Sequence, residues 1–117
     1  MAIHEPVLDY QVAVLHNDVV DYDRVIRITT TTGATVFLAF PSNPPDDWLQ
    51  FSGANATVYL PASDFDAMYR LLREESPLFV TTLNLLGIRA FTLDTGTESP
   101  GQAASDPAEL RELYTRS

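Results

Sequence analysis

The run Val36-Phe37-Leu38-Ala39-Phe40 is apolar at every position, and it constrains the fold more than any other feature of the chain. A β-strand directs successive side chains to opposite faces of its sheet. An unbroken apolar run of this length therefore predicts a central strand that is covered on both faces. The other elements of the chain must supply that cover.

The remaining pattern predicts an α+β domain with a mostly antiparallel sheet of about five to six strands. Turns are expected at Thr32-Gly33 and at residues 84–87, where each would connect two strands of a hairpin. β-Branched residues and alternating polarity predict strands near residues 7–16, 23–32, 34–40, 57–60, 78–83 and 88–93.

One main helix is expected from about Ser63 to Glu75, inserted before the C-terminal hairpin. Ser63 is the expected N-cap of this helix. The prolines and acids of residues 43–48 predict a further short helix. Helical spacing gives the main helix one apolar stripe, formed by Phe65, Met68, Tyr69 and Leu72.

The main helix is too small to cover the predicted sheet. Six strands spaced about 4.8 Å apart make a sheet roughly 29 Å wide. A helix of about 13 residues is only about 20 Å long and about 10 Å across. We therefore expect the sheet to curl toward a partial barrel, or to be covered by the loop around Trp48, by a C-terminal helix or by another subunit.

The C-terminal part of the chain differs in composition from residues 1–94, which we expect to form a single domain. Residues 95–105 are small and polar and are typical of a flexible linker. Residues 106–117 begin with signals of a short helix, whose apolar edge would be formed by Leu110, Leu113 and Tyr114. A helix this short is marginal alone, so we expect it to dock on its own domain or on a second subunit.

Composition excludes several classes of chemistry. The chain has no lysine and no cysteine, which rules out Schiff-base and thiolate catalysis, disulfides and cysteine-ligated zinc. A net charge of −9 argues against nucleic acid and anionic membranes as partners. We expect a cytoplasmic protein without a cofactor. The use of arginine without lysine is typical of a GC-rich bacterial genome.

The remaining reactive groups have ordinary structural explanations. The Asp21-Tyr22-Asp23 and Asp64-Phe65-Asp66 pairs could hold a divalent cation, but acids are common in turns and in the first turn of a helix. His16-Asn17-Asp18 could form a general base, yet it also fits a polar loop after a strand. We therefore predict no metal site and no catalytic residue, and we consider an enzyme the less favoured interpretation.

Two apolar features are not explained in this way. Leu85 and Leu86 lie at a hairpin tip, where Gly, Asn, Asp or Ser is normal. They predict an interface, together with Leu110, Leu113 and Tyr114, in a homodimer or with a protein partner. The favoured hypothesis is therefore a small binding or assembly module.

The alternative hypothesis is a small-molecule binder or a carboxylate-dependent enzyme. Trp48 and Phe51 lie in a long connection and could form the roof of a pocket over the sheet. His16 is a further candidate ligand-binding residue of this site.

Overall fold

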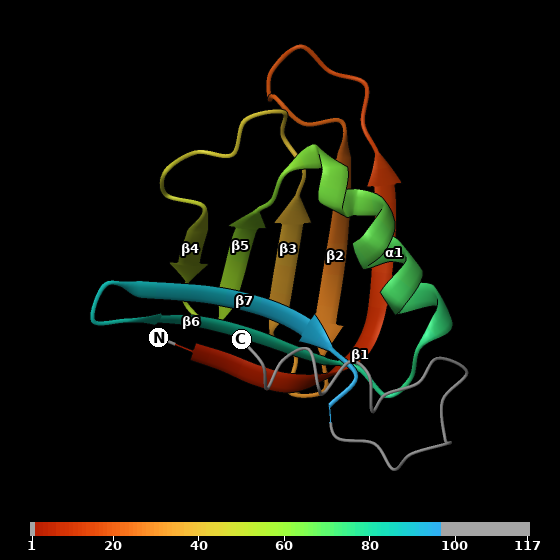
Figure 1. Cartoon of the computed structure of the whole chain (residues 1–117), viewed down its shortest axis with the longest axis vertical. Coiled ribbons are helices and arrows are strands. Elements are labelled where there is room, and N and C mark those ends of the chain that lie inside the picture. Colours follow the sequence, from red (N-terminus) through yellow and green to blue (C-terminus); the bar gives the residue numbers. More distant parts are fainter. Residues whose placement is uncertain (1, 97–117) are drawn as a thin grey trace, which may run out of the picture.

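The computed structural model describes residues 2–96, in which seven strands form one mixed sheet of order β4-β5-β3-β2-β1-β6-β7 (Figure 1). All neighbouring strands are antiparallel except β3 and β5, which are parallel. The α+β class and the mostly antiparallel sheet are thus confirmed, with one more strand than expected. The elements are β1 (Ala2–Val14), β2 (Arg24–Thr30), β3 (Thr35–Ala39), β4 (Leu49–Ser52), β5 (Asn55–Tyr59), a 3₁₀ turn (Ala62–Asp64), α1 (Phe65–Glu74), β6 (Phe79–Leu85) and β7 (Ile88–Asp94).

The long strand β1 joins the two halves of the sheet. Its residues 7–14 pair with β2, whereas its residues 2–6 pair with β6. The register with β2 shifts between Val7 and Asp9, so Leu8 is the extra residue of a β-bulge. A bulge bends its strand and increases the local twist. As a result, β6 and β7 cross in front of β2–β5, and the sheet is nearly closed (Figure 1).

The core lies between the two halves of this folded sheet. Helix α1 covers the part of the inner face that the β6–β7 hairpin leaves free (Figure 1). Phe65 of α1 packs edge-to-face on Phe40, with 5.2 Å between ring centroids, and Tyr69 contacts Tyr10. The curling that was expected from the small size of the helix is confirmed. Side chains with no exposed surface include Ile26, Ile28, Val36, Leu38, Val58 and Val80.

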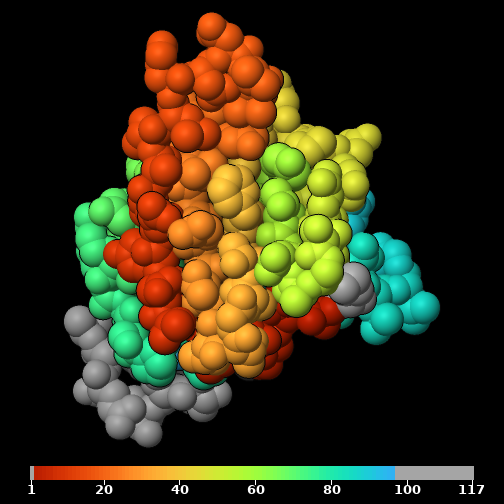
Figure 2. Space-filling model, turned by 180° about the vertical axis from the view of Figure 1, so that it is seen from behind, coloured from red at the N-terminus to blue at the C-terminus, as the bar shows by residue number. Residues whose placement is uncertain are grey.

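The opposite face of β1–β5, which we call the open face, is exposed over part of its area (Figure 2), although Val25 and Ala39 at one end of it are buried. The strand register places Gln11, Arg27, Phe37 and Thr57 in one row across it. Arg27 is exposed and Phe37 is only half-buried. The expected cover on both faces of the run from Val36 to Phe40 is therefore complete on one face only.

Two local expectations were wrong. Residues 43–48 form no helix; the strand β4 follows them and returns to β5 through a tight turn in which Gly53 has a φ of 61°. The side chain of Ser63 does not cap α1, because the chain enters the helix through the 3₁₀ turn and Asp64 takes the N-cap position, also without a side-chain hydrogen bond. Pairing with β5 stabilises β4, and local propensity does not report that pairing.

Thr30 and Thr82 are the buried polar residues of the described core, and they differ in their hydrogen bonds. The Thr30 hydroxyl donates to the Glu5 carboxylate and accepts from the Ala34 backbone N–H at 3.1 Å. The Thr82 hydroxyl has no partner within residues 2–96. A buried hydroxyl without a partner costs free energy, whereas a satisfied one does not.

We therefore expect Thr82→Val to raise the free energy of unfolding by about 1–2 kcal/mol, because valine has nearly the same shape and no polar atom to desolvate. Thr30→Val is the matched control and should lower the free energy of unfolding by about 1–3 kcal/mol, since it leaves its partners unsatisfied. Urea denaturation measures both values. Equal losses for the two variants would contradict this assignment.

Candidate functional site

The tip of the β6–β7 hairpin carries three large exposed apolar side chains at one place. Leu85, Leu86 and Ile88 are 56%, 92% and 65% exposed, and we call these three residues the apolar tip. The hairpin extends past β4 on one side of the molecule (Figure 1). From Asn84 to Ile88 the sequence contains no charged residue. The exposure of both predicted leucines agrees with a role in contact, although the contact itself stays a prediction.

Leucine at position 86 does not suit the turn that it occupies. Leu86 and Gly87 have φ values of 53° and 79° and connect Leu85 to Ile88, as in a type I′ turn. Asn-Gly is the preferred pair in such a turn, and the left-handed conformation costs a residue such as leucine about 1–2 kcal/mol. Since the side chain of Leu86 is almost fully exposed, the fold gains no packing in return.

Near its tip the hairpin is held to the loop before β4 by Arg89, which pairs with Asn84. The Arg89 guanidinium donates to the Asp46 carbonyl oxygen at 2.9 Å and to the Asp47 carboxylate at 3.3 Å. It also lies 5.8 Å from the centroid of the Trp48 ring, a distance at which cation–π attraction acts. These contacts hold the hairpin next to the apolar tip in a fixed position against the loop before β4. Sequence reasoning missed Arg89, because a lone arginine in a strand gives no signal of its partners.

The aromatic pair Trp48 and Phe51 is half-buried and packs against the core. A hollow of about 500 Å³ lies beside Phe51, while the Arg89 guanidinium lies over the Trp48 ring. The hollow is open and largely polar, which is a weak basis for binding a small apolar molecule. It is lined by Asp47, Leu49, Gln50, Phe51 and Asn84.

The other predicted residues are not brought to this hollow. His16 is exposed in the β1–β2 connection, where the neighbouring Asn17 carboxamide oxygen accepts hydrogen bonds from the backbone N–H groups of Val19 and Val20. This is the loop geometry that a polar turn adopts. Within residues 2–96, no group of three His, Asp or Glu side chains is placed to hold a metal ion. Leu110, Leu113 and Tyr114 lie outside the described residues.

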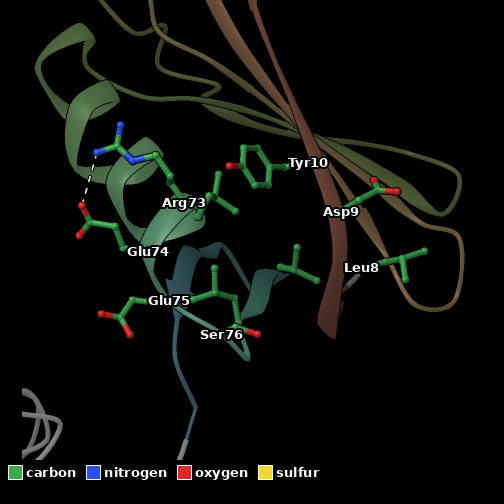
Figure 3. Close-up of a pocket in the computed structure, with 10 residues that line it drawn as sticks. Leu8, Asp9, Tyr10, Arg73, Glu74, Glu75 and Ser76 are labelled. Atoms are coloured by element: carbon green, nitrogen blue, oxygen red, sulfur yellow. Dashed lines mark hydrogen bonds and ion pairs between the residues drawn. The ribbon is translucent and has the colours of Figure 1, made fainter. Parts of the chain in front are cut away.

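A second hollow, of about 420 Å³, lies between the C-terminal end of α1 and the bulge of β1 (Figure 3). Its apolar wall comes from Val7, Leu72 and Leu78, of which Leu72 and Leu78 are each only 6% exposed. The 62% exposed side chain of Leu8 points to the other side of β1, away from α1 (Figure 3). We call this hollow the bulge pocket. The sequence did not predict it, since the register shift that exposes Leu8 is a property of strand pairing. The polar part of the lining consists of Asp9, Tyr10, Arg73, Glu74, Glu75 and Ser76.

Glu5 is the described residue with a clearly shifted pKa. Hydrogen bonds from the hydroxyls of Thr30 and Thr32 stabilise its charged form and lower the pKa of the carboxyl group below its ordinary value of 4.5; burial opposes this effect more weakly. A carboxyl group with a lowered pKa stabilises the fold above its unfolded pKa. That stabilisation is lost as the pH falls through the folded pKa.

We therefore expect the stability difference between the wild type and Glu5→Gln to be constant above about pH 5.5. It should shrink as the pH falls below 4.5, because protonation removes the charge that the two hydroxyls stabilise. Urea denaturation at a series of pH values measures this difference. A difference that does not change with pH would contradict the shift.

Comparison with known proteins gives no functional information: no family model, no curated protein and no solved structure matches the chain. Within residues 2–96, none of the helices has the length and apolar character needed to cross a membrane.

Proposed function

We propose that the protein is a small binding and assembly module that associates with a second copy of itself through the apolar tip. The observation that carries this proposal is Leu86, which is 92% exposed and sits in a left-handed turn position where the fold gains nothing from a leucine. A residue that is unfavourable in its turn and adds no packing to the fold is expected to serve a function other than folding.

The charge of the chain limits the surface through which a second copy could bind. With a net charge of −9, two copies repel each other over most of their surfaces. Association must then use apolar surface without charge, and the apolar tip is such a surface. Arg89, the nearest cation, is already engaged by Asp46 and Asp47. The expected location, a bacterial cytoplasm, is part of the same proposal and rests on the composition of the chain.

The proposal is tested by sedimentation of the full chain at increasing micromolar concentration. The wild type should shift from monomer to dimer, and Leu86→Asn should remain monomeric. Val19→Asn is the matched control, because Val19 is 90% exposed but lies in the β1–β2 connection. A wild type that stays monomeric, or a control that behaves like Leu86→Asn, would remove the proposal.

A further inference from the structure

We propose that a small hollow at the mouth of the folded sheet binds a short primary amine in its ammonium form, and that the Glu5 carboxylate recognises the charge. The hollow measures about 230 Å³, and we call it the mouth pocket. It is lined by the N-terminal part of β1, the β2–β3 turn and the β4–β5 turn. This binding is independent of the self-association through the apolar tip.

The fold brings together three segments that are far apart in the sequence. Ile3 and Glu5 belong to β1, Gly33 to the turn between β2 and β3, and Gly53 to the turn between β4 and β5. In Figure 1 the two turns lie at the lower ends of their strands, next to the N-terminal part of β1. The mouth of a curled sheet is a common place for a small-molecule site.

Glu5 is the one charged side chain in the described lining of the mouth pocket. Its Oε1 atom accepts hydrogen bonds from the hydroxyls of Thr30 and Thr32, which fix the direction of the carboxylate. Within residues 2–96, its Oε2 atom accepts no hydrogen bond, and no arginine forms an ion pair with it. A half-buried carboxylate in this state gains free energy from a cation that reaches the second oxygen.

The arrangement favours an ammonium group over other cations. A guanidinium binds a carboxylate best when it reaches both oxygens, and Oε1 already accepts two hydroxyls. Mg²⁺ and Ca²⁺ take about six or more oxygen ligands, whereas no group of three acidic or histidine side chains within the described residues could hold a metal ion. An ammonium is compact and can use a single oxygen.

The rest of the lining suits a short apolar body. Ile3 and Ala34 are buried, and Phe51 adds a half-buried aromatic ring. An alkyl chain that lies on these side chains is removed from water, and the face of an aromatic ring attracts an ammonium group. The hollow is smaller than the roughly 300–1,000 Å³ of a site for a drug-sized ligand. The ligand class is therefore an alkylamine of a few carbons.

Titration of the full chain with butylamine at neutral pH, where an alkylamine is protonated, tests the inference. The backbone amide NMR signals of Gly33 and Gly53 report binding, and that of Gly87 at the apolar tip is the internal reference. 1-Butanol is the uncharged probe of nearly the same shape. Glu5→Gln removes the charge that binds the amine. Glu74→Gln is the matched control, because Glu74 is an exposed glutamate of α1 that does not line the mouth pocket.

We expect butylamine to shift the signals of Gly33 and Gly53 in a saturable way. The dissociation constant should be about 10- to 100-fold higher for 1-butanol, and for butylamine with Glu5→Gln, because each change removes one charged hydrogen bond. Glu74→Gln should bind butylamine like the wild type, since a general attraction of cations to the acidic chain would weaken equally in both variants.

Equal binding of butylamine and 1-butanol to the wild type would overturn the inference. This comparison needs no variant, so it decides the question even if Glu5→Gln folds poorly. Absence of binding to the wild type would also overturn it, because the pocket would then be closed or filled in the full chain. Tighter binding of butylguanidine than of butylamine would overturn the assignment of an ammonium ligand.

Discussion

Replacing Phe40 with alanine is expected to lower the free energy of unfolding by about 3–5 kcal/mol, the usual cost of deleting a buried aromatic ring. Phe40 is 1% exposed and lies at the contact between the sheet and α1. Its ring packs on Phe65, and the Arg24 guanidinium lies 4.8 Å from the centroid of the Phe65 ring. The alanine variant would therefore leave a cavity beneath the helix and weaken the layer that covers this part of the sheet. Urea denaturation followed by the fluorescence of Trp48 measures the effect.

Phe37→Ala is the matched control for this substitution. Phe37 belongs to the same apolar run, but its side chain lies half-buried on the open face of the sheet. We expect a loss of about 1 kcal/mol, because less apolar surface is buried there. A loss as large as that of Phe40→Ala would mean that the open face is covered and would contradict the architecture described above.

Leu86→Asn is expected to have the largest effect on association. Burying a leucine side chain contributes about 1.5–3 kcal/mol, and a two-fold dimer contains the tip twice. Loss of both contacts should therefore weaken the dimer by about 10²- to 10⁴-fold. Sedimentation equilibrium measures the change in the dissociation constant.

The stability of the monomer should change in the opposite direction. Asn-Gly is the preferred pair for a type I′ turn, so Leu86→Asn should leave the free energy of unfolding unchanged or raise it by about 1 kcal/mol. Measuring the free energy of unfolding therefore shows whether Leu86→Asn weakens the dimer by removing a contact or by unfolding the monomer. A variant that is both monomeric and destabilised by several kcal/mol would not support an interface at the tip, because partial unfolding would then explain the result.

The central strand and the need to cover the sheet could both be predicted from the sequence. The apolar run from Val36 to Phe40 required a covered strand, and the short helix could not cover a sheet of that width. Together they predicted that the sheet curls, or is covered by the Trp48 loop, a C-terminal helix or another subunit, and the fold shows the curled sheet. The parallel pairing of β3 with β5 and the strand β4 were not predictable in this way, because both depend on contacts between segments that local propensity does not report.

The candidate site was predictable in part for a similar reason. Leu85 and Leu86 could be identified because residue preferences in turns depend on the local sequence, and leucine is unusual at the tip of a hairpin. The anchoring role of Arg89 and the bulge pocket beside Leu8 depend on strand register and on a loop distant in sequence. Trp48 was expected to roof a pocket, but its ring lies under the Arg89 guanidinium. Binding of a small molecule beside Phe51 stays a prediction, which quenching of Trp48 fluorescence by a metabolite would support.

The central claim is that this acidic chain associates through the apolar tip, and sedimentation equilibrium of the wild type and Leu86→Asn side by side tests it most directly. The account predicts that the wild type dimerises in the micromolar range, while Leu86→Asn sediments as a folded monomer at the same concentrations. A wild type that remains a monomer throughout, or a Leu86→Asn variant with an unchanged dissociation constant, would contradict it.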